Sequence, residues 1–120
     1  MNRLSIERAI LSSYIYQYHF NTGFNIKLDP NDFKSKFHRW LIKQLNKYQR
    51  SDPMLIVDAI EKKLEGSKWE DEYLEVLASN PLPKRVAIDY LETLKEIRIL
   101  EEADNAYKEF KKKLLAVKGG

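Results

Sequence analysis

The chain has 120 residues, of which 43% are hydrophobic and 32% are charged. This is the size of one domain with one hydrophobic core, and the composition is that of a folded protein and not of a disordered segment. Basic side chains number 21 and acidic ones 18, for a net charge of +3. The charge is therefore mixed, and a nucleic-acid surface would have to come from local clustering.

The sequence contains no cysteine, which excludes a disulfide framework, a thiolate metal site and a cysteine nucleophile. The first residues mix apolar and charged side chains, without the apolar run of a signal peptide or a membrane span. We therefore expect a cytoplasmic protein that does not associate with a membrane.

Only four glycines and four prolines occur, at positions where helices would begin or end, so the sequence predicts an all-α fold. The first helix is expected from about Ile6 to Phe20. Its inward positions keep helical spacing and are Ile6, Ala9, Ile10, Ser13, Tyr14 and Gln17. Additional apolar side chains at Ile15, Tyr16 and Tyr18 predict that this helix is packed on more than one face.

Asp29-Pro30 and Asp52-Pro53 each offer an N-cap side chain followed by a proline suited to the first helical position. We expect the second helix to begin at the first pair, and the third to run from the second pair to about Leu64, before Gly66. The residues that the second helix turns inward would be Phe33, Phe37, Trp40, Leu41, Leu45 and Tyr48. Such aromatic spacing favours a core stripe over a platform for stacking bases.

Ser67 and Glu70 match a capping box, which predicts a fourth helix to Ala78. The prolines of residues 80–83 require an extended connection. From Lys84 nothing interrupts a helix until Gly119. We expect a single domain with five to six helices in total. Residues 1–83 should form a compact helical bundle. Residues 84–120 should form a long C-terminal helix that packs on the bundle and protrudes from it.

The long helix carries apolar residues at steps of three and four, which is close to the heptad pattern of a helix that pairs with another helix. The pattern comprises Ile97, Leu100, Ala103, Tyr107, Phe110, Leu114 and Val117. A helix of this length outgrows the core of a small bundle, so its far end should need a partner.

Lysines gather at the end of the same helix, at Lys108, Lys111, Lys112, Lys113 and Lys118. They are candidate phosphate contacts, through charge alone. The alternative is a solvated helix tail whose cations lie near the negative end of the helix dipole, with nearby carboxylates such as Glu101 and Glu109 partly cancelling the positive field.

No motif for catalysis or for a cofactor is present. There is no glycine-rich phosphate loop, and His19 and His38 do not stand at metal-binding spacing from another strong ligand. We expect His38 to lie at the boundary of the core, hydrogen-bonded to a neighbouring helix. The carboxylates near Glu70 and Glu75 are expected to form a solvated face. The sequence therefore predicts a chain that is not an enzyme and holds no cofactor or metal.

Residues 4–100 resemble the N-terminal domain of DnaB-type replicative helicases. Residues 5–12 (SIERAILS) are similar to the opening stretch of that family, and residues 32–42 (DFKSKFHRWLI) are similar to its Asp-Phe-Tyr-x-x-x-His-Arg-x-Ile-Phe motif, with Lys34 in place of the tyrosine. A further likeness lies in Tyr73-Leu74 with Leu77-Ala78, and then in Tyr90 and Leu94. Two departures are Pro53-Met54-Leu55, where the family has Pro-Ile-Asp, and Glu101, where it has an arginine.

The resemblance implies a helical bundle followed by a helical hairpin, of which residues 84–117 would be the first arm. In that family these domains assemble as the collar of a hexameric ring and receive the primase. The resemblance therefore implies a non-catalytic domain that forms dimers and larger homo-oligomers and binds primase. ATP, magnesium and most DNA contacts would belong to a helicase domain outside this chain.

The helix-to-helix contacts of such a domain would come from Tyr90, Leu94, Ile97, Leu100, Tyr107, Phe110 and Leu114. Two alternatives stay open. One is the helicase-binding C-terminal domain of DnaG-type bacterial primases, which is similar in fold to the helicase domain. The other is a nucleic-acid-binding module that uses the lysine-rich end of the last helix.

Overall fold

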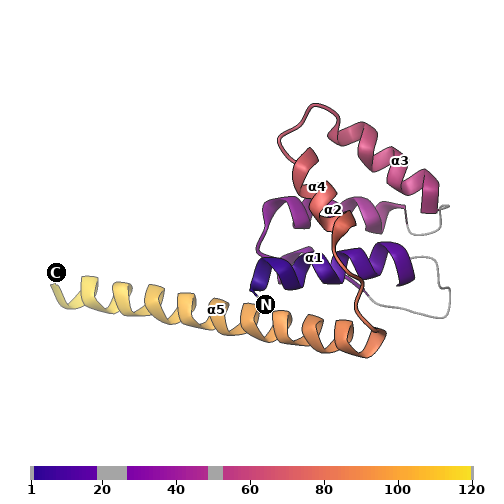
Figure 1. The fold of residues 1–120 in the computed structure, drawn as a ribbon. Coiled ribbons are helices and arrows are strands. Elements are labelled where there is room, and N and C mark those ends of the chain that lie inside the picture. The colour runs from indigo at the N-terminus through magenta and orange to yellow at the C-terminus, as the bar shows by residue number, and fades with distance from the viewer. Residues whose placement is uncertain (1, 19–26, 49–52, 120) are drawn as a thin grey trace.

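The computed structural model describes residues 2–18, 27–48 and 53–119, and every element in these ranges is helical. Four helices form a bundle, and a fifth lies along one side of it and extends away (Figure 1). The α-helices are α1 (Arg3–Ser13), α2 (Lys36–Lys47), α3 (Pro53–Leu64), α4 (Glu70–Ala78) and α5 (Lys84–Gly119). The predicted all-α bundle with a long protruding C-terminal helix is confirmed.

Helix α1 begins earlier than predicted because Asn2 caps it, its side-chain oxygen accepting the Ser5 N–H at 2.8 Å. It continues into a π-helical segment, η1 (Tyr14–Tyr18), where the sequence predicted ordinary α-helix. The predicted packing on more than one face is confirmed at Ile15, which is buried like Ile10 and Leu11, but it is wrong for Tyr16, which is 52% exposed. His19 and Phe20 lie outside the described residues, as do the side chains of Gln17 and Tyr18.

The second helix begins later than predicted. Asp29 does cap a helical turn, accepting the Asn31 N–H at 2.9 Å, but that turn is only the 3-10 helix η2 (Pro30–Asp32), and α2 starts at Lys36. Between them the backbone N–H groups of Lys34 and Ser35 donate to the Glu7 carboxylate of α1, at 3.0 and 3.4 Å. These bonds hold the segment extended, so a residue 27 positions away overrides the local helix start.

Ser35 is the true cap of α2, its hydroxyl accepting the His38 N–H at 3.3 Å. Below it Phe37, Leu41 and Leu45 are buried at helical spacing, as predicted, while Trp40 and Tyr48 are only half-buried. Phe33 is fully buried too, although it lies before the helix.

Helix α3 buries one residue per turn at Ile56, Ile60 and Leu64, and ends as predicted before Gly66, whose φ of +76° only glycine adopts without strain. Asp52 lies outside the described residues. The predicted capping box is wrong: the Ser67 hydroxyl accepts the Trp69 N–H at 3.2 Å, and α4 starts at Glu70 without a side-chain cap.

The connection from α4 to α5 is not helical, as its prolines predicted, and two buried serines of α1 hold it in place. The Ser12 hydroxyl donates to the Ser79 carbonyl at 2.7 Å, and the Ser13 hydroxyl accepts the Leu82 N–H while donating to the Ala9 carbonyl. These contacts give buried polar groups their partners and fix the point where α5 leaves the bundle.

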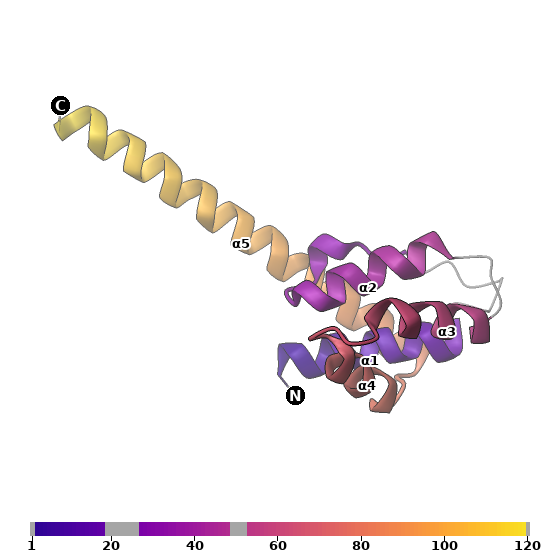
Figure 2. The ribbon, with the colours of Figure 1, turned by 90° about the horizontal axis from the view of Figure 1, so that it is seen from above.

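Helix α5 has 36 residues, which corresponds to a length of about 54 Å. The longest dimension of the described structure is 61 Å, so this one helix sets it. Seen from above, the first half of α5 lies against the bundle and the second half leaves it (Figure 2).

Candidate protein-interaction surface

The first half of α5 is part of the core. Ala87 and Leu94 are buried against the bundle, and Tyr90 and Leu91 are half-buried against the same core. The contacts are made chiefly with α1 and η2. This half of the helix is therefore covered by the chain itself.

Two ion pairs mark where the docked part of α5 ends. Arg98 Nε lies 2.8 Å from Asp32 Oδ1, and Glu101 Oε1 accepts from Arg3 Nη1 at 3.0 Å. The Asp32 side chain is only 7% exposed, and burial raises the pKa of its carboxyl despite the opposing charge of Arg98. Arg98 is therefore the main compensation for a carboxylate that the fold removes from water.

A buried polar pair joins α1 and α2, and the sequence alone did not identify its acidic member, Glu7. Glu7 Oε1 lies 2.8 Å from His38 Nδ1, and both side chains are 1% exposed. The expected hydrogen bond of His38 to a neighbouring helix is confirmed, but its expected place at the boundary of the core is wrong, because the side chain is fully buried. Burial alone would raise the pKa of the Glu7 carboxyl, but hydrogen bonds from His38, Lys34 and Ser35 outweigh burial and hold that pKa below its usual value.

Beyond Glu102 every described side chain of α5 is exposed, up to Val117. The stretch from residue 103 to 119 extends about 25 Å past the docked part. Its large apolar side chains are exposed to solvent: Tyr107 and Phe110 are both 63% exposed. Isolated exposed apolar residues are ordinary, but a continuous row of them indicates a contact surface.

These residues lie on one face of α5, which we call the outward seam. At about 100° per residue, its members fall within a sector of roughly 100°. The face that contacts the bundle, at Ala87, Leu94 and Arg98, is centred about 180° away. The outward seam comprises Leu100, Ala103, Tyr107, Phe110, Leu114 and Val117.

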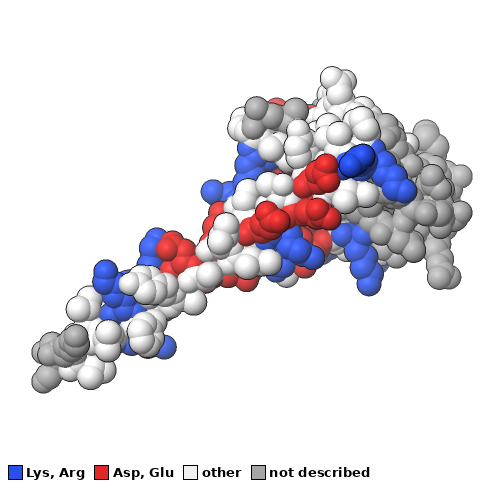
Figure 3. Space-filling model, turned by 90° about the horizontal axis from the view of Figure 1, so that it is seen from below, with Lys and Arg blue, Asp and Glu red and all other residues white. Residues whose placement is uncertain are grey.

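The outward face of α5 changes character along the helix. Where α5 lies against the bundle this face is polar and exposed, with Asp89, Glu92 and Glu96, and the apolar row begins only where the helix leaves the bundle. Figure 3 shows this face, with acidic atoms gathered near the bundle and uncharged atoms running along the protruding end between lysines. The seam is therefore a separate surface and not an extension of the core stripe.

The structure divides the predicted contact residues into two groups. Leu100, Tyr107, Phe110 and Leu114 are exposed on the outward seam. Leu94 is 1% exposed in the core of this chain, which corrects its assignment to a partner surface, and Tyr90 and Ile97 are half-buried. The steps from Ile97 to Leu100 and on to Ala103 are both of three residues, so Ile97 falls toward the bundle side and out of the heptad register.

The predicted phosphate-contacting lysines are exposed on the protruding end. Lys108 Nζ pairs with Asp104 at 2.9 Å one turn earlier, and Lys111, Lys112 and Lys113 follow it around the helix. The side chain of Lys118 lies outside the described residues. Lys111 and Lys113 flank the outward seam, whereas Lys112 lies on the opposite side of the helix, so these lysines do not form a single basic face.

Within the described ranges, no group of three or more histidine, aspartate or glutamate side chains is placed to hold a metal ion. No helix among the described residues has the length and apolar character needed to cross a membrane. No protein family, no curated protein and no solved structure matches this chain.

Proposed function

We propose that this chain is a protein-interaction domain that joins subunits of a replicative helicase assembly, and that its outward seam binds the same seam of a second copy. The observation that carries the proposal is the exposure of a heptad-like apolar row on the side of α5 that faces away from its own bundle. The bundle cannot cover this face, because the two faces lie on opposite sides of one rigid helix. The likeness to the DnaB-type N-terminal domain supplies the biological setting.

A second copy fits the outward seam in an antiparallel arrangement. From Ala103 onward the steps between seam residues alternate between four and three, so the residues occupy the a and d positions of a heptad in turn. In an antiparallel pair each a residue of one copy faces a d residue of the other. The layers that result are Leu100 with Val117, Ala103 with Leu114, and Tyr107 with Phe110, where the second residue of each pair belongs to the second copy. All three layers share one register, and the smallest side chain faces a large one.

The charges beside the seam also favour the antiparallel arrangement. It places Asp104 of one copy near Lys111 of the other, twice per dimer by symmetry. A parallel pair would instead bring the lysine-rich ends together, with Lys113 near Lys118 of the second copy. Like charges at that spacing repel, so the parallel pair is disfavoured.

The antiparallel arrangement also leaves room for the bundles. Each bundle lies on the side of α5 away from the outward seam, and the two would sit at opposite ends of the paired helices. Helicase and primase then have the exposed surfaces of the bundles available. The seam spans fewer than the three to four heptads of a stable coiled coil, so we expect a reversible association that depends on concentration.

Light scattering of the purified chain over about 10 µM to 1 mM tests the proposal. We expect the mass to rise from that of a monomer toward that of a dimer. Replacing Tyr107 and Phe110 together with glutamine should weaken association at least about tenfold, since central aromatic side chains dominate such interfaces. The matched control is Leu115→Gln, which removes an apolar side chain that is 59% exposed but lies off the seam.

Equal association of the seam variant and the control would contradict the proposal. The same measurement, made with added primase and separately with added helicase, distinguishes a helicase domain from a primase domain. A mass shift with primase supports the helicase domain, and a shift with helicase alone supports the primase domain. No shift with either would remove the replication setting and leave only self-association.

A further inference from the structure

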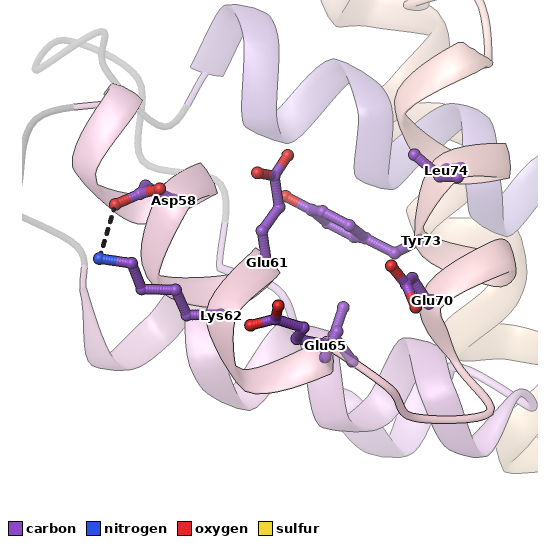
Figure 4. A pocket seen from close by; sticks show the side chains of 8 residues that line it. Asp58, Glu61, Lys62, Glu65, Glu70, Tyr73 and Leu74 are labelled. Atoms are coloured by element: carbon purple, nitrogen blue, oxygen red, sulfur yellow. Dashed lines mark ion pairs between the residues drawn. The ribbon is translucent and has the colours of Figure 1, made fainter.

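A cavity of about 300 Å³ opens between α3 and α4, on elements that do not include the outward seam (Figure 4). Its wall includes Glu61 from α3, Glu65 from the turn that follows α3, and Glu70, Tyr73 and Leu74 from α4. This volume is at the lower end of the range for binding pockets. It suits one side chain or a small molecule better than an extended ligand.

The charge of this cavity is negative and largely uncompensated. Lys62 also lines it, but its Nζ pairs with Asp58 at 3.3 Å one turn earlier. Among the described residues no ion pair joins Glu61, Glu65 or Glu70 to a cation. Three carboxylates therefore face one opening without a counter-charge.

A second observation is independent of these acids. The Tyr73 side chain is 2% exposed, and its hydroxyl has no hydrogen-bond partner among the described residues. In Figure 4 the ring reaches from α4 toward Glu61, with the hydroxyl at its inner end. An unpaired buried hydroxyl is unfavourable, so its presence at the wall of a cavity indicates a group that is bound there.

The Tyr73 hydroxyl is a neutral partner. Burial, and after it the negative charge of Glu61, raises the pKa of Tyr73 well above its ordinary value. The hydroxyl therefore keeps its proton at physiological pH and can both accept and donate one hydrogen bond. A cation with several N–H donors would satisfy the hydroxyl oxygen and the carboxylates at the same time.

We propose that this cavity binds the guanidinium of an arginine side chain that belongs to a partner protein. A guanidinium offers five donors in one plane and is weakly hydrated, so it suits a site with one buried hydroxyl and several carboxylates better than an ammonium does. Leu74, which is 57% exposed at the edge of the cavity, provides an apolar contact for a residue beside that arginine. The inference does not depend on α5 or on the replication setting.

A titration followed by the amide resonances of the whole chain tests this site. The probes are N-acetyl-arginine amide and the uncharged analogue N-acetyl-citrulline amide, and a third probe is the peptide acetyl-Leu-Arg-Leu-amide. We expect the arginine probe to shift resonances around Glu61, Glu65 and Tyr73, the citrulline probe to leave them unchanged, and the peptide to bind at least about fivefold tighter than the arginine amide.

Equal responses to arginine and citrulline, or none, would overturn the proposal. A peptide that binds no tighter than the arginine amide would overturn the assignment to a partner protein, because a free cation would then suffice. Any of these results leaves the seam of α5 untouched, so the two proposals fail separately.

Two variants locate the binding. Tyr73→Phe keeps the buried ring and removes only the unpaired hydroxyl, so the chain should fold at least as stably while its affinity for the arginine probe falls about fivefold. Glu61→Gln should weaken binding similarly and reduce its dependence on salt. Glu72→Gln is the matched control, an exposed carboxylate of α4 that does not line the cavity. Unchanged affinity in both Tyr73→Phe and Glu61→Gln would contradict the site.

Discussion

The two halves of α5 are one continuous helix in two different environments. The first half buries Ala87 and Leu94 and forms ion pairs with the bundle through Arg98 and Glu101, whereas the second half exposes an equally apolar row to solvent. Periodicity alone does not separate these halves. The direction of the apolar face distinguishes the two halves, because this face moves by about half a turn around the helix where the bundle ends.

The largest difference between the halves should appear in stability. Leu94→Ala should lower the free energy of unfolding by about 2–5 kcal/mol, because it opens a cavity in a buried contact. Leu114→Ala removes the same atoms from an exposed position and should change the free energy of unfolding of the monomer by about 0.5 kcal/mol or less. Urea unfolding at low protein concentration measures both. Equal effects would mean that the protruding half is packed in solution.

The Glu7 carboxylate is also linked to the docked half of α5 through Arg3. Its contribution to the free energy of unfolding should depend on pH. Glu7→Gln should cost about 1–3 kcal/mol at neutral pH, because the amide replaces an ionised acceptor that serves His38 and two backbone N–H groups. The folded pKa of Glu7 is lowered from 4.5, so unfolding takes up a proton below that pH. Its contribution is present above about pH 4.5 and is lost as the pH falls through the lowered pKa.

The measurement is urea unfolding of the wild type and of Glu7→Gln at several pH values from 7 to 3. The stability difference between the two should shrink as the pH falls below 4.5. A difference that stays constant would show that the charge of Glu7 does not contribute. Asp32 acts in the opposite direction, because its raised pKa favours the folded state as the pH falls, so the comparison with the Gln variant and not the raw pH profile is informative.

The smallest effect concerns the charges beside the seam. Asp104→Lys or Lys111→Asp alone should weaken self-association about two- to fivefold, and the two changes combined should restore it, because exposed ion pairs contribute about 0.2–1 kcal/mol each. Sedimentation equilibrium measures the three dissociation constants, and circular dichroism checks that the helix persists after its Asp104–Lys108 pair is lost. Failure of the combined change to restore association would argue against the antiparallel register.

The sequence predicted the helices well where the information is local. Runs of helical spacing and the stops near Gly66 and Pro81 are local properties, and the lengths of α3, α4 and α5 follow from them. The start of α2 could not be found this way, since Glu7 on α1 captures the Lys34 and Ser35 N–H groups that a local helix start would have used. A competing long-range hydrogen bond leaves no trace in local spacing.

The candidate surfaces were predictable to different degrees. Heptad spacing identified most of the outward seam, but it could not tell that Leu94 is covered by the bundle, because coverage depends on how α5 crosses α1. The cavity between α3 and α4 was missed altogether. Glu61 and Glu70 each look like solvated charges, and only the fold brings them to one cavity that the Tyr73 side chain, with its unpaired hydroxyl, also lines.

The most direct test of the paired seam uses the absence of cysteine from the chain. Leu100→Cys and Val117→Cys variants, carrying tags of different size, are mixed and oxidised gently. The antiparallel register brings residue 100 of one copy opposite residue 117 of the other, within the Cα separation of about 7 Å that a disulfide allows. We predict that the mixed species dominates, and that each variant alone links poorly. Efficient linking of each variant to itself, or no linking in the mixture, would contradict the account.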